Sequence, residues 1–277
     1  MKPQVAPYET SVKCLRIVCR NGLTVRVTRY PVDLVMSNGQ VYVSGSGYDF
    51  TSYEATAGFS PSAFDLEGIL GFAGVTRDAV ASGVFDGARA YLFACDYRNP
   101  VEDYEPIVAS FLGKGTLTDS GYRFEEMALI DALNQSVGDT YKPQCGKVFG
   151  GQEYAGCKVS LAALTVTGTL TSVTSSSAFA DAGRSESSDW FALGTICFTS
   201  GLNAGLKPLE IKSFAAGGGI VTYEPFYYTP VIGDAYEMIP GCRKRLSDCR
   251  DKYANVVNFG GFPDMPTSSV YAQVGTR

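Results

Sequence analysis

Short apolar runs separated by glycines and polar turns recur along the whole chain of 277 residues. In the first third these runs are residues 12–18, 23–28 and 40–44. They are separated by Asn21-Gly22 and by Ser37-Asn38-Gly39. Asn-Gly between two extended runs is a hairpin signal, because a type I′ turn needs positive φ. The pattern predicts a mainly β protein.

The same pattern continues beyond the first third. Further strands are expected at residues 88–95, 107–112, 115–117, 158–166, 190–197, 210–214 and 219–223. Residues 51–62 are polar and predict a loop, and residues 124–135 fit neither the strand nor the helix period. One of a few short helices is predicted after Thr76 as N-cap, ending at Gly83.

The composition changes around residues 136–141, and we place a domain boundary there. Residues 1–135 are expected to form an N-terminal β-rich domain, similar to a barrel or a sandwich. Residues 136–277 are expected to form a C-terminal β domain. A chain of this length can bury an ample core in each.

Charge and composition exclude several classes of function. The formal net charge is −5, so the basic footprint of a nucleic-acid-binding protein is absent. No apolar run approaches the roughly 20 residues that span a bilayer. The first five residues, Met1 to Val5, lack the apolar core of a signal peptide, which predicts synthesis in a cytoplasm.

The chain contains no histidine. This excludes Ser-His-Asp and Cys-His nucleophilic machinery, zinc sites with histidine ligands and histidine acid–base chemistry. A metal site in this protein must therefore use sulfur or oxygen ligands.

Four of the eight cysteines are grouped in two pairs, Cys145 with Cys157 and Cys242 with Cys249. In a reducing compartment, grouped cysteines are more often metal ligands or catalytic groups than disulfides. Eleven residues separate the first pair and six the second, whereas structural zinc knuckles usually enclose two to four. The wider spacing favours an iron–sulfur cluster, with zinc as the alternative.

The charge around the second pair supports this interpretation. Residues 242–252 carry five cations against Asp248 and Asp251, in a chain that is acidic overall. A cluster held by four thiolates is anionic, and its burial is costly without compensating charge. The alternative is that the four cysteines are ordinary buried thiols and the basic run is a solvated surface.

The remaining cysteines, the carboxylate pairs and the glycine-rich run are weaker candidates for a functional site. Cys14, Cys19, Cys95 and Cys197 are expected to fill the core as small hydrophobic residues. The carboxylate pairs Glu125-Glu126, Asp248/Asp251 and Asp181/Glu186 are expected on the solvated surface. Gly217-Gly218-Gly219 lacks the lysine of a phosphate loop. No active site is evident, so we expect no enzyme.

The segment from Pro240 onward carries a recognisable pattern: Pro240-Gly241-Cys242-x-Lys244-Arg245-x-x-x-Cys249-x-Asp251-Lys252-Tyr253-x-Asn255-x-x-Asn258-Phe259-x-Gly261-Phe262-Pro263. It resembles a family of phage and prophage tail-tip hub proteins, which includes lambda-type minor tail protein L and the hub protein of gene transfer agents. The resemblance extends upstream through Cys145 to Cys157 and through residues 83–88. It covers much of the chain from about residue 60 onward.

The resemblance implies a structural component of the tail tip of a long-tailed phage, assembled in the host cytoplasm and located in the virion. It would lie between the distal tail ring and the central fibre or receptor-binding hub, as a homotrimer. Its partners would be the distal tail protein, the central fibre or hub protein and the tape measure. The lambda-type members carry a [4Fe–4S] cluster, whose ligands correspond to Cys145, Cys157, Cys242 and Cys249.

The sequence departs from the family pattern at Gly260, where arginine is usual, and at Asp264, where histidine is common. Neither position is a proposed ligand. Two other classes of function stay open beside the structural one. The first is a zinc-stabilised β interaction module, and the second is an iron–sulfur redox protein.

Overall fold

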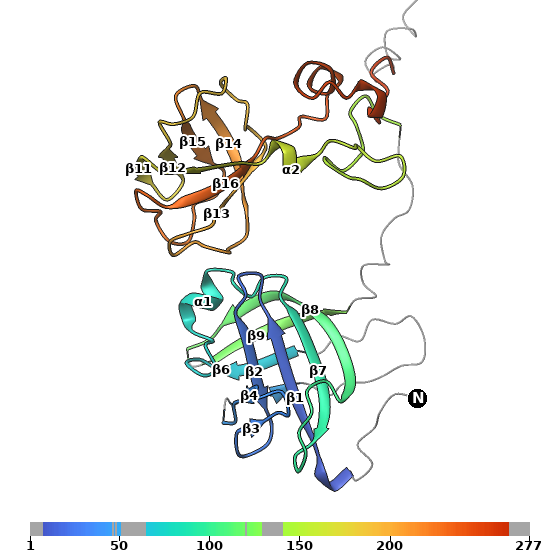
Figure 1. Cartoon of the computed structure of the whole chain (residues 1–277), viewed down its shortest axis with the longest axis vertical. Coiled ribbons are helices and arrows are strands. Elements are labelled where there is room, and N and C mark those ends of the chain that lie inside the picture. The colour runs from blue at the N-terminus through green and yellow to red at the C-terminus, as the bar shows by residue number, and fades with distance from the viewer. Residues whose placement is uncertain are drawn as a thin grey trace, which may run out of the picture. The chain divides into compact units, whose positions relative to one another are not determined.

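Antiparallel sheets are the framework of both halves of the chain in the computed structural model, which describes residues 8–45, 47, 49–50, 65–119, 121–128 and 141–265 (Figure 1). Two units are distinct. The first comprises residues 1–135 with 205–207, and the second comprises residues 136–204 and 208–277. The expectation of a mainly β protein with few short helices is confirmed.

The first unit is built on a seven-stranded sheet of order β2-β1-β7-β8-β9-β6-β5. Its strands are β1 (Ser11–Val18), β2 (Thr24–Thr28), β5 (Asp49–Phe50), β6 (Asp65–Ile69), β7 (Arg89–Asp96), β8 (Glu105–Leu117) and β9 (Gly121–Ala128). A short 3-10 turn, Tyr8–Thr10, precedes β1. The runs predicted at 107–112 and 115–117 are one strand, β8, whose register shifts between Leu112 and Gly115.

Both faces of this sheet are covered. On one face a large core gathers Leu15 of β1 with Leu66, Leu92 and Phe124. On the other, a smaller core gathers Cys14 with residues of a separate hairpin, β3 (Leu34–Val35) and β4 (Val41–Tyr42). Cys14 and Leu15 are neighbours on β1 and are both fully buried, because side chains alternate between the faces and each face has a cover.

The predicted turns and the first helix have the local chemistry that the sequence indicated. Gly39 has φ +80° in the β3–β4 turn, where the amide of Met36 donates to the carbonyl of Gln40. The helix α1 (Arg77–Ala81) begins after Thr76, whose hydroxyl accepts a hydrogen bond from the amide of Ala79. Gly83 ends it with φ +77°.

The second unit contains a seven-stranded sheet of order β10-β16-β13-β14-β15-β12-β11. Its strands are β10 (Val166–Thr169), β11 (Ser172–Ser175), β12 (Ala178–Ala180), β13 (Thr195–Phe198), β14 (Leu209–Ala215), β15 (Gly219–Thr222) and β16 (Ala235–Ile239). The two edge strands, β10 and β11, are separated only by Leu170 and Thr171. Because β10 pairs with β16 and β11 with β12, this bend joins the two edges and curls the sheet round its core.

Two predicted strands of the second unit are wrong in part. Residues 158–166 instead contain a short helix, α2 (Leu161–Leu164), capped by the hydroxyl of Ser160, and β10 begins only at Val166. Of residues 190–197, only those from Thr195 onward form a strand. The preceding turn is apolar because Phe191 is fully buried in the core of the sheet.

Some predictions fall partly or wholly outside the described residues. The expected loop at 51–62 lies there, as do residues 129–135 of the ambiguous segment. Residues 121–128 of that region form β9. Among the described residues, no helix is long and apolar enough to cross a membrane.

Candidate metal centre

The four cysteines predicted as ligands lie in two segments of the second unit that pack against each other. We call residues 141–160 and 240–265 together the cysteine lobe. In Figure 1 the lobe is the yellow-green loop and the red turns, beside α2 and to one side of the sheet. The amide of Cys145 donates to the carbonyl of Lys244 at 2.9 Å, which joins the two segments next to the cysteines.

Cys249 lies on an unusual element. Residues Asp248–Lys252 form a single π-helical turn, and π-turns are frequent at functional sites. Asp248 is buried at the start of this turn, where its carboxylate accepts a hydrogen bond from the amide of Arg243 at 2.9 Å. The guanidinium of Arg243 lies 3.2 Å from the same carboxylate. This contact fixes the hairpin between Cys242 and Cys249.

Strained backbone conformations, with positive φ at non-glycine residues, are concentrated near the cysteines. Eight non-glycine residues in the described part of the chain have positive φ, and four of them lie in the cysteine lobe: Ala155, Lys158, Lys244 and Ala254. Ala155 and Lys158 flank Cys157, while Lys244 follows Cys242 by two positions. Such conformations cost of order 1–3 kcal/mol each and persist only where surrounding contacts impose them. The lobe is therefore held in a specific shape.

Hydrogen-bond donors point at three of the four sulfur atoms. The amide of Gly260 lies 3.3 Å from the sulfur of Cys145, and the amide of Lys244 lies 3.4 Å from that of Cys242. The side-chain amide of Asn255 lies 3.8 Å from the sulfur of Cys157. Donors of this kind stabilise thiolates that bind metals.

Electrostatics indicates that the four thiols are neighbours. The pKa of Cys249 is raised, first by burial and then by the nearby charges of Cys242, Cys157 and Cys145. Burial also raises the pKa of Cys242, although the amide and charge of Lys244 oppose the shift. Four thiolates this close repel one another, so the deprotonated set needs a cation between the sulfur atoms.

The basic residues of the lobe have partners that sequence alone did not indicate. Arg243 pairs with Asp248, and Arg250 pairs with Asp251 at 2.7 Å. Lys244 instead donates to the carbonyl of Lys147. The cations therefore lie close to the cysteines, as expected, but several of them also hold the backbone of the lobe together.

Lys252 connects the lobe to the rest of the second unit. Its ammonium donates to the carbonyl of Gly241 at 2.8 Å and to the carbonyl of Trp190. It also lies 5.0 Å from the centre of the Trp190 ring and 5.2 Å from that of Tyr253. The hydroxyl of Tyr253 donates to the same Gly241 carbonyl at 2.6 Å. In the sequence, Lys252 is one cation of a basic run, and no neighbouring residue indicates this anchoring role.

The donor set fits a sulfur-ligated group. It offers four neighbouring sulfurs and amide donors, and the chain has no histidine. In the described ranges, however, no three His, Cys, Asp or Glu side chains are arranged so that they could hold a metal ion. A single zinc ion would therefore require the sulfur atoms to move closer together. The cluster stays a prediction.

The other cysteines and the carboxylate pairs differ in part from expectation. Cys14, Cys19 and Cys95 are buried, as predicted, whereas Cys197 is half-exposed on β13. One carboxylate of each pair expected on the surface is instead buried: Glu126, Asp181 and Asp248. Each has a polar partner, which for Asp181 is the hydroxyl of Tyr236 at 2.6 Å. Such partners are supplied by the tertiary fold and cannot be read from neighbours in the sequence.

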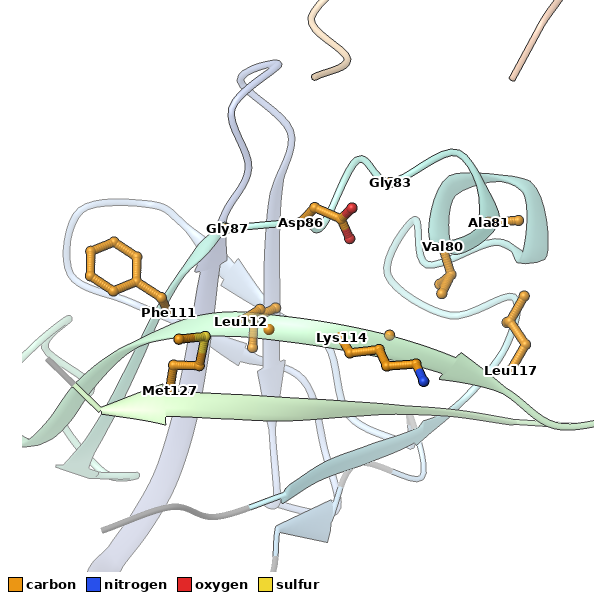
Figure 2. A pocket seen from close by; sticks show the side chains of 12 residues that line it. Val80, Ala81, Gly83, Asp86, Gly87, Phe111, Leu112, Lys114, Leu117 and Met127 are labelled. Atoms are coloured by element: carbon orange, nitrogen blue, oxygen red, sulfur yellow. The ribbon is translucent and has the colours of Figure 1, made fainter. Parts of the chain in front are cut away.

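A groove in the first unit has no comparable chemistry. It lies between α1, the turn at residues 83–87 and strand β8, as Figure 2 shows. Asp86 and Lys114 are its charged lining residues, and the other lining residues are apolar or glycine. Nothing in this lining combines a nucleophile with a base.

The fold is mainly β in both units, and comparisons with known proteins identify the class of the protein. Residues 7–160 match the family model "Baseplate hub protein, N-terminal attachment domain", which covers more than half of the chain. The chain belongs to this family. Residues 189–269 match "Phage conserved hypothetical protein BR0599", a segment that contains Cys242 and Cys249.

A solved structure with the same fold comes from the virion of a native gene transfer agent particle. It superposes with a TM-score of 0.81 at 24% sequence identity, over 95% of this chain and 90% of that chain. Among curated proteins, none matches. The protein is therefore a structural hub component of a phage virion, as the resemblance in its sequence implied.

Proposed function

We propose that this hub protein lies at the tail tip and that a [4Fe–4S] cluster, bound by Cys145, Cys157, Cys242 and Cys249, stabilises its cysteine lobe. In this proposal the cluster is a structural group and the protein is not an enzyme. The hub occupies the position between the distal tail ring and the central fibre or receptor-binding hub.

One observation carries the structural role of the cluster. Within the cysteine lobe, all of whose residues the structure describes, the only buried apolar side chains are those of Pro240, Cys157 and Cys249. A segment of this size without an apolar core needs another source of folding free energy. Metal binding supplies it, because the free energy of binding becomes free energy of folding when the site does not form without the metal.

Different residues of the cysteine lobe would bind the cluster, donate hydrogen bonds to its ligands and attach the lobe to the sheet. The four cysteines supply thiolates, and the amides of Gly260 and Lys244 donate to two of them. When bound, the cluster supplies strong iron–thiolate bonds that join residues about a hundred positions apart. Lys252 anchors the lobe to the turn at Trp190 and so transmits this rigidity to the sheet.

The two rival functions make different demands on the site. A zinc-stabilised module would use the same four sulfurs around one ion. A redox protein would need a face for an electron-transfer partner or a pocket for a substrate beside the cysteines. The groove in the lobe is instead lined by Tyr141 and residues 261–265, whose polar side-chain groups are the phenol of Tyr141 and the carboxylate of Asp264.

The partners follow from the place in the virion. We propose a homotrimer on the tail axis that contacts the distal tail protein, the central fibre or hub protein and the tape measure. Cross-linking of intact particles followed by mass spectrometry tests this arrangement. Links from this chain to a distal tail protein and to a central fibre protein are expected. Links to capsid proteins alone would contradict the proposed position.

Replacing the ligands one at a time tests the structural role. Cys242→Ser and Cys157→Ser should make the lobe sensitive to limited proteolysis or leave the protein insoluble. Cys197→Ser is the matched control, because Cys197 lies outside the lobe on β13 and should behave as wild type. Ligand variants that remain as protease-resistant as the control would reject a structural cluster.

A further inference from the structure

The first unit contains a second pair of thiols, separate from the cysteine lobe. Cys14 of β1 and Cys95 of β7 are both fully buried, and their sulfur atoms lie 3.9 Å apart. The strands are antiparallel, with Cys14 opposite Phe93 and Val12 opposite Cys95. The two cysteines are therefore diagonal neighbours on one face of the sheet.

We infer that Cys14 and Cys95 form a latent disulfide, which closes by exchange with small disulfides once the virion has left the reducing cytoplasm. Such compartments outside the cell favour disulfides, whereas glutathione and thioredoxin keep thiols reduced inside it. The inference rests on the location in a virion and on the geometry of the first unit. It is independent of the proposed cluster.

The two sulfurs are 3.9 Å apart, compared with about 2.05 Å in a disulfide. Diagonal neighbours in a sheet typically have Cα atoms about 7–8 Å apart, whereas a disulfide spans about 4.4–6.8 Å, so closure requires β1 and β7 to shift toward each other at this point. Cys14 also lies 3.4 Å from the hydroxyl of Thr28 on β2, so a polar group is present beside the pair.

The contact between the two thiols lowers the pKa of Cys95, whereas that contact and burial raise the pKa of Cys14. Only a thiolate attacks a disulfide, so the thiol that loses its proton first attacks and the other thiol resolves the mixed disulfide. Either order gives the same products.

The exchange balances with oxidised glutathione as the oxidant. When Cys95 is the first to react, its thiolate attacks one glutathione sulfur, and the other glutathione leaves with the electron pair of the broken S–S bond. Cys14 gives up its proton to that thiolate and attacks the sulfur of Cys95 in the mixed disulfide, and the second glutathione leaves. Two protein thiols are oxidised, and one glutathione disulfide is reduced to two glutathione molecules.

The β3–β4 hairpin controls access to the pair. Its residues Leu34, Met36 and Tyr42 belong to the same small core as Cys14 and Cys95. Two strands of two residues each form this cover. The hydroxyl of Tyr42 donates to Glu102 at 2.6 Å, which fastens the hairpin to the loop after β7. Opening of this hairpin is the local unfolding event that admits a small disulfide.

Peptide mapping of the full chain tests the inference. The protein, purified without oxygen, is incubated with oxidised glutathione, treated with an alkylating reagent and digested with trypsin. Cleavage after Lys13, Arg16, Arg89 and Arg98 places Cys14 in peptide 14–16 and Cys95 in peptide 90–98. A disulfide-linked species of these two peptides is expected, lighter by two hydrogens than their sum.

Two variants sharpen the result. Glu102→Gln replaces a hydrogen bond to a carboxylate with a weaker one to a neutral amide, so it loosens the hairpin and should speed formation of the linked species about tenfold. Cys19→Ala is the matched control, because Cys19 is a buried thiol at the end of β1 outside the pair, and it should not change the rate. The wild-type measurement needs no variant to fold.

Two outcomes would overturn the inference. In the first, Cys14 and Cys95 both remain open to alkylation after denaturation, in the wild type and in Glu102→Gln. In the second, one of the two cysteines accumulates as a mixed disulfide with glutathione that the other does not resolve. Either result would leave the pair as ordinary core thiols.

Discussion

The side-chain amide of Asn255 donates to the carbonyl oxygen of Cys157 at 2.6 Å, across 98 positions of the sequence. The backbone amide of the same residue donates to the carbonyl of Cys249 at 2.7 Å. Asn255 therefore touches one cysteine from each segment of the lobe. It positions two proposed ligands without being a ligand.

Replacing Asn255 should weaken retention of the metal. Asn255→Asp keeps the shape of the side chain but removes the donor and places a negative charge beside two thiolates. We expect faster loss of iron to a chelator, by about 10- to 100-fold, as for other residues that orient metal ligands. Asn99→Asp, on an exposed turn of the first unit, is the control. Equal rates of iron loss in both variants would contradict this role.

Lys252 should stabilise the attachment of the lobe to the sheet. Lys252→Met removes hydrogen bonds to two carbonyls and the contact with the Trp190 ring, and should lower the free energy of unfolding by about 1–3 kcal/mol. Trp190 is the single tryptophan, so its fluorescence reports the change during denaturant unfolding. Arg245→Met, at an exposed position of the same segment, should leave the midpoint unchanged. If Lys252→Met unfolds at the same denaturant concentration as the wild type, Lys252 does not anchor the lobe to the sheet.

Tyr236 should contribute a buried hydrogen bond to the sheet of the second unit. Tyr236→Phe leaves the buried carboxylate of Asp181 without its donor at 2.6 Å, which typically costs about 1–3 kcal/mol. Tyr223→Phe removes a hydroxyl from an exposed tyrosine and is the matched control. The measurement is the denaturant midpoint of unfolding of the two variants. Equal midpoints would mean that water replaces the hydroxyl of Tyr236 as the partner of Asp181.

The stability of the first unit should fall in acid through Glu102. Burial alone would raise the pKa of Glu102, but hydrogen bonds from Tyr42 and Asn38 and the charges of Arg16 and Arg26 lower it. The unfolded state therefore binds the proton more readily than the folded state. The stabilising contribution is complete above the unfolded pKa, about 4.3, and is lost as the pH falls through the folded value.

Glu102→Gln tests this linkage. The variant should be less stable than wild type at pH 7, and the difference between the two should shrink as the pH falls below about 4. Unfolding midpoints between pH 3 and pH 7 provide the measurement. A difference that is constant over this range would show that ionisation of Glu102 does not contribute.

Much of the candidate site could be predicted from the sequence, because its signals are local. The spacing of four cysteines, the missing histidines and the five neighbouring cations are all visible in the printed chain. What could not be predicted depends on distant contacts. The burial of Asp248 depends on the hairpin that begins at Arg243, and the role of Lys252 depends on the carbonyl of Trp190.

The fold shows the same division. Hairpins with Asn-Gly turns and the Thr76 cap follow from local chemistry. Residues 158–166 are predicted as a strand but contain the helix α2, because Ser160 caps the run Leu161–Leu164, whose leucines and alanines favour a helix. The bend at Leu170 and Thr171 joins the sheet edges through pairings with β12 and β16, which no local pattern encodes.

The iron and acid-labile sulfide content of the protein tests the central claim most directly. The wild-type protein should be purified without oxygen and compared with Cys242→Ser. A [4Fe–4S] cluster predicts about four iron and four sulfide per chain, with a brown colour that is lost in the variant. Stoichiometric zinc in a colourless wild-type protein, or no metal at all in a folded one, would contradict the account.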